Sequence, residues 1–482
     1  MKVAFVNNSN ESLGVEYLSA YLKQHGHSAN VFVDPQLFND ENIKSDSLHR
    51  FFDYKKDLVR DILLYKPDLI GISVVSDFYP WACLLAEEIK KHCNIPVIFG
   101  GIHPTTMPEE VINNSFVDML CVGEGEQALL EVVEKLQSGG WPEDVANIWV
   151  KSSGKIKKNN IRPLIKDLDL LPFPDKMLFS KAGSHYDIGY FTMASRGCLY
   201  RCSYCYNSYL GKLYKGANYY RYRSVENLIR ELEVGFSKKK HRIIRFSDDI
   251  FPFEKQWLSE FSIKYPKRIG APFICYIHPQ TTDEETIMLL KKSGCCEVQI
   301  GVQTLYERTQ RDVLNRDIKS KTWEDLIRWI KKYGIAITAE NIIGIPGQSE
   351  NEVKDMVRFY ARNRVNRVHI FWLRYYPKTE ISDRFKEPDS NHPQRPFTMG
   401  GDVLKKEMVR LRILFSLTQV FPKTVIEFFL KNRLYSFMPV WPLFLINIFS
   451  NITSGTCSDK ITRKREKLKY MFYIRKKLWQ KS

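Results

Sequence analysis

The 482-residue sequence has no secretory leader, no low-complexity tract, no internal repeat and no apolar segment long enough to cross a bilayer. Its most apolar run, residues 437–449, is shorter than the about 20 residues that a transmembrane helix needs. The 10 cysteines show no disulfide framework, because seven of them are scattered through apolar surroundings. These absences argue against a secreted or membrane-spanning protein and predict a protein of the reducing cytoplasm.

Positive charge is concentrated near the carboxyl end. Residues 401–482 hold 17 lysines and arginines against 5 acidic residues, so they carry +12 of the chain's net charge of +17. The first 400 residues are nearly balanced, and no nucleic-acid-binding surface is expected on them. Two interpretations of the basic tail stay open: a helical cap over the substrate opening, or a peripheral contact with the inner, anionic surface of a membrane.

Three cysteines are clustered, in contrast to the other seven. Cys198, Cys202 and Cys205 follow a predicted strand, residues 190–194, and a turn signal at Arg196-Gly197. A compact loop with this spacing can aim three thiolates at one point. Three ligands are one fewer than a structural zinc site uses, whereas an iron–sulfur cubane held by three thiolates keeps one iron open. The alternatives are a zinc loop with a distant fourth ligand, or three unrelated thiols.

Strand and helix patterns alternate through residues 1–150. The predicted strands are residues 2–7, 29–33, 68–74, 96–101 and 119–122. Helices are predicted from Val15 to about Gly26, over residues 51–64 and over residues 81–91. This alternation predicts a doubly wound parallel sheet, in which ligands bind beyond the carboxyl ends of the strands. The candidate ligand-binding residues in the loops at that edge are Asn8, Gly14, Ser73, Gly100, Gly101, His103, Gly123, Glu124, Gly125 and Glu126.

A proline-rich connector, residues 151–186, leads to a second α/β unit, residues 187–385. Six strand–helix units there predict a partial β/α barrel, open on one side, whose site lies at the carboxyl ends of the strands. Candidate residues at those ends are Asp248, Asp249, Gln303, Gly344 and Gly347. One of the two aspartates is expected to face the barrel mouth and the other to cap the following turn. Gln303 and the two glycines could equally form tight turns. Residues 386–482 are predicted to be helical.

The spacing Cys-x3-Cys-x2-Cys, with Tyr204 before the last cysteine, resembles the radical S-adenosylmethionine (radical SAM) enzymes. The resemblance implies that Cys198, Cys202 and Cys205 hold a [4Fe–4S] cluster whose open iron binds S-adenosylmethionine. It also implies that the reduced cluster cleaves this cosubstrate to a 5′-deoxyadenosyl radical, and that a reducing partner such as flavodoxin or ferredoxin is needed. The implied cosubstrate contacts are Tyr204, Asp248 or Asp249, Gln303 near the ribose, and Gly344 to Gly347 near the adenine.

Residues 1–150 resemble the cobalamin-binding domain of cobalamin-dependent radical SAM enzymes. The resemblance rests on Gly-Gly-x-His-Pro-Thr at residues 100–105, on Asp118 and on Gly-Glu-Gly-Glu at residues 123–126. The motif Asp-x-His-x-x-Gly, whose histidine binds cobalt in many such domains, is missing. His103 is therefore expected to contact the backbone or the edge of the cofactor. The predicted fold class is α/β: a Rossmann-like cobalamin-binding domain, a partial (β/α)6 barrel and a helical basic carboxyl-terminal region.

The resemblance favours a methyltransferase that abstracts hydrogen from an unactivated carbon of a small-molecule or lipid-like substrate and then transfers a methyl group from cobalamin. One alternative is a cobalamin-dependent cyclase or rearrangement enzyme without methyl transfer, similar to the anaerobic porphyrin-ring cyclases. A second alternative is a non-catalytic corrinoid sensor. A methylthiotransferase is disfavoured, because the amino-terminal region holds no second cysteine triad.

Overall fold

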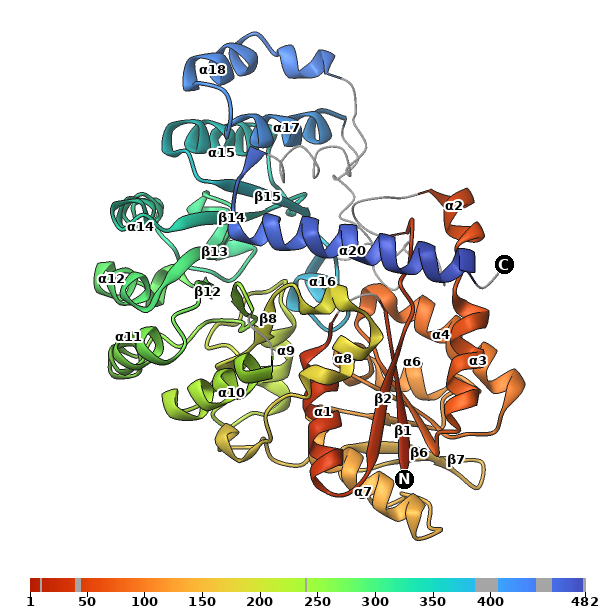
Figure 1. The fold of residues 1–482 in the computed structure, drawn as a ribbon. Helices are drawn as coiled ribbons and strands as arrows, with labels where there is room; N and C mark the ends of the chain where they lie inside the picture. Colours follow the sequence, from red (N-terminus) through yellow and green to blue (C-terminus); the bar gives the residue numbers. More distant parts are fainter. Residues whose placement is uncertain (9–10, 40–44, 239–240, 386–405, 439–452, 480–482) are drawn as a thin grey trace.

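The computed structural model describes residues 1–8, 11–39, 45–238, 241–385, 406–438 and 453–479. Two α/β units lie against each other, and helices of the carboxyl-terminal region pack above and across them (Figure 1). Residues 439–449 of the predicted apolar run lie outside the described residues. Within the described part of the chain, no helix is both long and apolar enough to cross a membrane.

The amino-terminal unit is built on a seven-stranded sheet. In spatial order its strands are β2 (Ser28–Val33), β1 (Lys2–Asn7), β3 (Leu69–Ser73), β4 (Val97–Gly100), β5 (Met119–Cys121), β6 (Ile148–Ser152) and β7 (Lys155–Lys158). The strands from β2 to β5 are parallel, as the sequence pattern predicts.

Both faces of this sheet are covered by helices, which explains the nearly continuous apolar runs of its strands. On β1, Val3 and Phe5 pack toward one face and Ala4 and Val6 toward the other. The helices of the first face are α1 (Leu13–Gln24) and α7 (Glu126–Gln137). Those of the second face are α3 (Lys55–Tyr65), α4 (Tyr79–His92) and α6 (Pro108–Ile112), with the short α5 (Ile102–Thr106) preceding α6.

Two boundaries differ from the sequence-based expectation. The sheet continues to Lys158 through the antiparallel strands β6 and β7, although residues from 151 onward were expected to belong to the connector. All four residues of β7 are exposed, so this lysine-rich edge strand lacks the apolar alternation that marks a strand. The helix expected at residues 51–64 is two helices, α2 (Asp46–Phe51) and α3, because the Asp53 carboxylate accepts a hydrogen bond from the Lys55 amide (2.9 Å) and starts a new helix.

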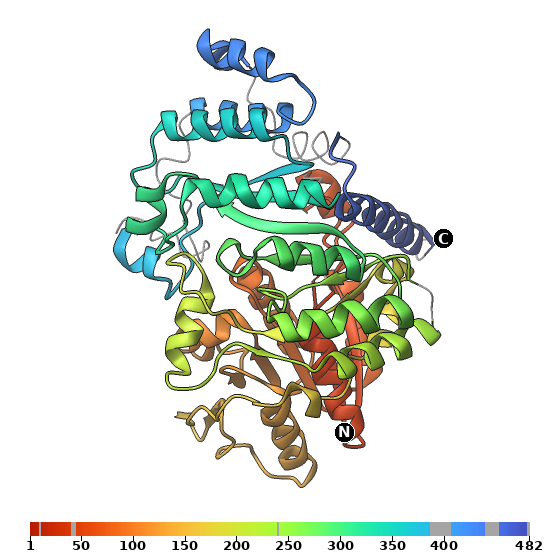
Figure 2. The ribbon, with the colours of Figure 1, turned by 90° about the vertical axis from the view of Figure 1, so that its left-hand side faces the viewer.

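The second unit is a partial barrel. Its six parallel strands follow the spatial order β8 (Tyr190–Thr192), β11 (Ile244–Phe246), β12 (Phe273–Ile277), β13 (Cys295–Gln303), β14 (Ala336–Ile343) and β15 (Arg367–Trp372). Strands β8 and β15 do not pair, so the barrel is open between them, as predicted. Its outer helices, which cover the face toward the viewer in Figure 2, are α10 (Val225–Lys238), α11 (Lys255–Arg268), α12 (Glu284–Ser293), α13 (Glu307–Asp312), α14 (Ser320–Lys332) and α15 (Glu350–Asn363).

Short elements connect and extend the barrel. Helix α8 (Lys176–Ala182) lies in the connector and packs beside β2. The small antiparallel ribbon of β9 (Ser195–Arg196) and β10 (Arg221–Tyr222) flanks α9 (Tyr206–Leu213). After β15 come α16 (Glu380–Phe385), α17 (Lys406–Leu417) and α18 (Lys423–Lys431), and the last two pack on α15.

The last described helix, α20 (Cys457–Trp479), joins the two units. Its first turn closes the barrel interior, since the Ser458 amide donates to the Glu297 carboxylate (2.8 Å). Near its other end, the Tyr470 hydroxyl accepts a hydrogen bond from the Phe38 amide of the amino-terminal unit (3.0 Å). In Figure 1 this helix crosses in front of the gap between the units. Of the described helices of the basic tail, α20 is therefore the one that bridges the two units and covers the barrel.

Candidate functional site

The cysteine loop is fixed in place by backbone contacts on three sides. Gly197, which opens the loop, has φ +84°, and a Cβ there would lie 2.2 Å from the Tyr219 carbonyl oxygen, so only glycine fits. In the middle of the loop, the Ser203 amide donates to the Leu314 carbonyl (3.0 Å) and the Ser203 carbonyl accepts from the Ile381 amide (2.9 Å). Helix α9 begins immediately after Cys205. The loop is therefore ordered by its surroundings before any ligand binds.

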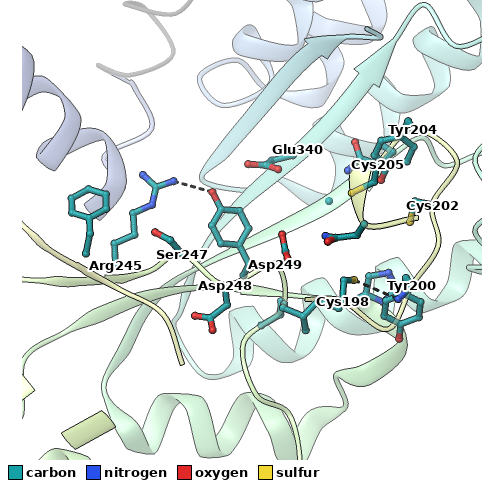
Figure 3. Close-up of a pocket in the computed structure, with 18 of the residues that line it drawn as sticks. Cys198, Tyr200, Cys202, Tyr204, Cys205, Arg245, Ser247, Asp248, Asp249 and Glu340 are labelled. Atoms are coloured by element: carbon teal, nitrogen blue, oxygen red, sulfur yellow. Dashed lines mark hydrogen bonds between the residues drawn. The ribbon is translucent and has the colours of Figure 1, made fainter. Parts of the chain in front are cut away.

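Cys198, Cys202 and Cys205 are half-buried and all three line one cavity of about 670 Å³ at the carboxyl ends of the barrel strands (Figure 3). Burial raises the pKa of the Cys198 and Cys205 thiols to about 12 in the metal-free protein, and bound iron would reverse this by stabilising the thiolates. Among the described residues, no three histidine, cysteine or acidic side chains converge to hold a single metal ion. Three thiols around one cavity fit a cluster, in which each cysteine binds its own iron.

The two adjacent aspartates have different surroundings. Asp249 lines the cavity, and burial raises its pKa while a hydrogen bond from Asn207 opposes the shift. One oxygen of Asp248 accepts hydrogen bonds from the Ala194 amide (2.8 Å) and from the Ser195 amide and hydroxyl (2.5 and 2.6 Å). One of the two aspartates was expected to cap the turn after this strand. Asp248 instead bonds to the segment after β8. It ties the end of β11 to the segment that precedes the cysteine loop.

Replacing Asp248 with asparagine is expected to remove a pH dependence of stability. Burial raises the pKa of this carboxyl from 3.8 to about 7, so the folded protein binds its proton more tightly than the unfolded chain does. The free energy of unfolding should therefore fall as pH rises from about 4 to about 7. Denaturant titrations of the cofactor-free protein would give the free energy of unfolding of the wild type minus that of Asp248→Asn. We expect this difference to be larger at pH 5 than at pH 7.5, by on the order of 2 kcal/mol. An equal difference at both pH values would contradict the assignment.

Of the remaining residues predicted in the barrel, Tyr204 and Gln303 line the cavity. Gln303 has φ +65°, an unfavourable conformation for a residue with a side chain, and such strain is typical of functional sites. Gly301 makes room for the Gln303 side chain, because a Cβ at Gly301 would lie 2.5 Å from the Gln303 amide nitrogen. Gly344 and Gly347 are not among the cavity-lining residues. Both have positive φ and form the turn after β14, where the Gly344 amide donates to the Gln348 side chain (2.9 Å).

Arg316 also lines this cavity, although no role was expected for it from the sequence. It is 5% exposed, and its guanidinium donates to the Gly301 carbonyl (2.8 Å) and to the Tyr204 hydroxyl (3.3 Å). No carboxylate of the described residues lies within ion-pair distance of it. A buried guanidinium without an anionic partner is unfavourable unless a ligand supplies one. The segment Leu314-Asn315-Arg316 contains no local motif that marks a binding residue. Arg316 reaches the cavity because this segment folds back along the cysteine loop, where Leu314 accepts a hydrogen bond from the Ser203 amide.

A second cavity, of about 350 Å³, lies at the carboxyl edge of the amino-terminal sheet. The predicted residues that line it are Gly14, Ser73, Gly100, Gly101, Gly123, Glu124, Gly125 and Glu126. Its far wall belongs to the barrel unit and includes Met193 and residues 195–197. The two cavities share Ser247, Asp248 and Asp249, so they meet between the two units.

The two glutamates of the Gly-Glu-Gly-Glu segment pair with arginines of the barrel unit. Arg196 donates to Glu124 (3.2 Å) and Glu126 (2.6 Å), and Arg221 donates to Glu124 (2.9 Å). Burial disfavours the charged form of Glu124, but Arg221 and Arg196 outweigh it and lower its pKa. These ion pairs dock the two units against each other at the rim of the second cavity.

Two predicted residues of the amino-terminal unit do not line this cavity. Asn8 is buried beside the end of β1. His103 is fully buried in α5, where its Nδ1 lies 3.0 Å from the Ser76 hydroxyl and its ring lies 4.0 Å from that of Tyr79. Burial lowers the pKa of His103 to about 4. His103 therefore contacts the Ser76 and Tyr79 side chains and is not among the residues that line the cavity.

The second cavity penetrates between the sheet and the helices α1 and α7, where an α/β unit is normally close-packed. Phe5 and Ile98 line it from the middle of their strands, and Gly71 between them adds no side chain. An empty apolar space of this size would destabilise the fold, because its lining atoms lose packing contacts. The cavity therefore fits an apolar ligand group, and it shares the lining residues Ser247, Asp248 and Asp249 with the cysteine-lined cavity.

Comparison with known proteins identifies two family models in the chain. The model of the Radical SAM superfamily matches residues 193–360, and that of the B12 binding domain matches residues 3–133. Among curated proteins, an uncharacterized methyltransferase of Pyrococcus horikoshii is 26% identical over 67% of this chain and 71% of its own length. The anaerobic magnesium-protoporphyrin IX monomethyl ester cyclase of Rubrivivax gelatinosus is also 26% identical, over 80% of this chain and 70% of its own length.

Solved structures support the same fold. The radical S-adenosylmethionine methyltransferase TsrM from Kitasatospora setae, with tryptophan substrate and a cosubstrate analogue bound, has a TM-score of 0.63 at 17% identity and covers 80% of this chain and 75% of its own. The cobalamin-dependent S-adenosylmethionine radical enzyme OxsB, with aqua-cobalamin and S-adenosylmethionine bound, has a TM-score of 0.60 at 18% identity, over 79% of this chain and 54% of its own.

Proposed function

The chain belongs to the radical SAM superfamily and carries a B12 binding domain, and from this premise we propose that it methylates an unactivated carbon of a small-molecule substrate. Its cofactors are a [4Fe–4S] cluster, S-adenosylmethionine and cobalamin. When bound, the cluster supplies the electron that cleaves the sulfonium, and cobalamin supplies the methyl group. The observation that carries the proposal is the meeting of the two cavities at residues 247–249, which lets a substrate reach both cofactors.

The residues of the first cavity match the polar groups of S-adenosylmethionine. Cys198, Cys202 and Cys205 would hold the cluster. We assign Asp249 to the amino group of the methionine moiety, because its carboxylate faces the cavity. We assign Arg316 to the carboxylate of that moiety, because its guanidinium has donors to spare there and no anionic partner. Gln303, held over Gly301, would contact the ribose hydroxyls.

The second cavity suits cobalamin bound without a protein histidine on cobalt. The slot between Phe5, Gly71 and Ile98 would accept the base of the cofactor's nucleotide tail, and the glycine loops at the edge of the sheet would let the corrin ring approach the backbone. A Cβ at Gly101, whose φ is +104°, would lie 2.8 Å from the Val74 carbonyl oxygen, so that loop is held in its open shape by glycine. The cofactor would then lie over the barrel mouth.

Label transfer tests the proposal against cyclisation, which the broad match to the Rubrivivax cyclase favours as a second candidate. The reconstituted enzyme would be supplied with methyl-deuterated S-adenosylmethionine, a reductant and an extract of the source cells, and the products read by mass spectrometry. Methylation predicts one compound that gains a deuterated methyl group. Cyclisation predicts a compound that loses two hydrogens without label, and a corrinoid sensor predicts no 5′-deoxyadenosine.

The reductant also needs a docking surface, and we propose the outer side of the cysteine loop. Cys202 lines the main cavity and also a second depression, of about 210 Å³. Arg311 lines this second depression. The side chains of Arg311 and Arg308, one turn apart on α13, are 62% and 89% exposed. An acidic electron carrier such as flavodoxin would be attracted to this face.

Reversing the charge of Arg311 should slow reduction by a protein donor. For Arg311→Glu at low ionic strength we expect the rate of cluster reduction by flavodoxin, followed by the bleaching of visible absorbance, to fall about tenfold. Reduction by dithionite should be unchanged, since this small reductant needs no docking surface. Arg328→Glu is the matched control, because its side chain is 67% exposed on α14, away from the loop. Equal losses in both variants would refute the assigned surface.

A further inference from the structure

The end of the main cavity that lies opposite the cysteine loop contains an arginine that the contacts proposed above do not use. Arg245 projects from β11 toward the cavity, at the far side from Cys198, Cys202 and Cys205 in Figure 3. Arg245 lines the cavity from β11, and Ser247, Asp248 and Asp249 line it from the segment that follows this strand. Since the cosubstrate must contact the cluster, the Arg245 end of the cavity is left for the substrate.

The guanidinium of Arg245 has only neutral partners. It donates to the Tyr276 hydroxyl (2.9 Å) and to the Gln299 side-chain oxygen (3.3 Å), and it lies 5.9 Å from the ring centres of both Phe191 and Tyr276. In the described part of the chain, no carboxylate forms an ion pair with it. Glu340 lines the same cavity but is not within ion-pair distance. Burial raises the pKa of Glu340, and the longer-range attraction of Arg245 opposes this rise.

Arg316, assigned above to the cosubstrate, shares this lack of an acidic partner, whereas four other largely buried arginines are paired. Arg196 pairs with Glu124 and Glu126, Arg223 with Glu231, Arg367 with Asp459, and Arg465 with Glu11. Arg465 is the informative case, because it lines the same cavity from α20 and its charge is already balanced. A desolvated guanidinium without an anionic partner is unfavourable, so the lack of one at Arg245 indicates that an anion is missing from the cavity.

We propose that the substrate is an organic anion and that Arg245 binds its carboxylate or phosphate group, with Tyr276 as a second donor. The Tyr276 hydroxyl accepts from Arg245, so its own hydrogen is free to donate to the same anion. The planar guanidinium matches the geometry of either group. Phe191 and Ile461 form apolar walls beside it, which suit a hydrocarbon or aromatic portion of the substrate. This inference rests on the proposed function, because it takes the cavity to hold substrate and cosubstrate together.

The test uses isosteric probes that differ in charge. Binding of phenylacetate, phenyl phosphate, phenylacetamide and phenethylamine would be measured by calorimetry on the protein reconstituted with cluster, corrinoid and S-adenosylmethionine, without reductant. We expect at least one of the two anions to bind about tenfold more tightly than the amide and the amine. Arg245→Gln should abolish this preference. Arg245→Lys, which keeps the positive charge but lacks the paired N–H donors of the guanidinium, should retain part of it. A purely structural role of Arg245 would change the binding of all four probes alike.

Iron content, corrinoid content and 5′-deoxyadenosine formation in the same preparations separate this inference from the proposed function. If the wild type cleaves S-adenosylmethionine but shows no preference for either anion, or if Arg245→Gln keeps the preference, the anion site is refuted and the enzyme assignment stands. If the wild type holds no cluster or cleaves no cosubstrate, the proposed function fails whatever the probes do. Arg245→Gln is expected to keep its iron and corrinoid, which would show that it folds.

Discussion

Replacing Cys202 with alanine is expected to reduce the iron content from about four to less than about one per chain and to lower S-adenosylmethionine cleavage by at least about a thousandfold. The reason is that each of the three cysteines that line the cavity would bind one iron of the cluster, so the loss of one thiolate leaves only two protein ligands. Iron and sulfide analysis of anoxically reconstituted protein measures the first effect. Chromatographic detection of 5′-deoxyadenosine measures the second.

Cys296→Ala is the matched control for this loss. Cys296 is a partly buried free cysteine on β13 that does not line the cavity, so its removal should leave about four irons and full cleavage. Two results would overturn the cluster assignment: Cys202→Ala protein that retains its iron, or wild-type protein that binds one zinc ion per chain instead of iron and sulfide.

Filling the second cavity should separate cobalamin binding from cleavage of the cosubstrate. Gly100 ends β4, and a Cβ there would lie 4.0 Å from the Cβ of Cys121, which lines the cavity from the adjacent strand. A leucine at position 100 would therefore extend into the cavity without a backbone clash. For Gly100→Leu we expect the corrinoid content, read from its visible absorbance, to fall from about one to less than about 0.1 per chain. Iron content and 5′-deoxyadenosine formation should stay at the wild-type level, while methyl transfer is lost.

A smaller substitution calibrates this effect. Gly100→Ala adds only the Cβ and should retain most of the corrinoid. The thermal midpoint of cofactor-free Gly100→Leu should be no lower than that of the wild type, because filling an apolar cavity does not destabilise the fold. Full corrinoid content in Gly100→Leu would show that the cofactor binds elsewhere.

The sequence predicts the alternation of strands and helices in both units well, because the strands are short apolar runs with helices between them. It does not predict β7, whose lysines are exposed at the sheet edge, or the break between α2 and α3. Hydrophobic periodicity predicts buried faces, so it does not identify a strand whose residues are exposed or a helix start that is stabilised by polar groups. The extent of the amino-terminal sheet therefore had to come from the structure.

The site could be predicted where function is carried by a local motif, and not where it depends on distant contacts. The cysteine spacing and the glycine loops identify most of the residues that line the two cavities. Arg245 and Arg316 have no local motif, and they differ from other arginines only in lacking an acidic partner after folding. The reverse holds for Glu124 and Glu126, whose motif suggests ligand binding although their carboxylates are paired with arginines of the barrel unit.

The position of α20 in the chain has a consequence for how the holoenzyme is assembled. Four residues of this helix, Ile461, Thr462, Arg465 and Glu466, line the main cavity, yet α20 follows every other wall of that cavity in the order of synthesis. Domains fold as units during translation, beginning at the amino terminus. The nascent protein therefore passes through a stage in which both α/β units are formed but the cavity is unroofed. In that stage we expect the three cysteines to be more accessible than in the finished protein, in which α20 covers the cavity.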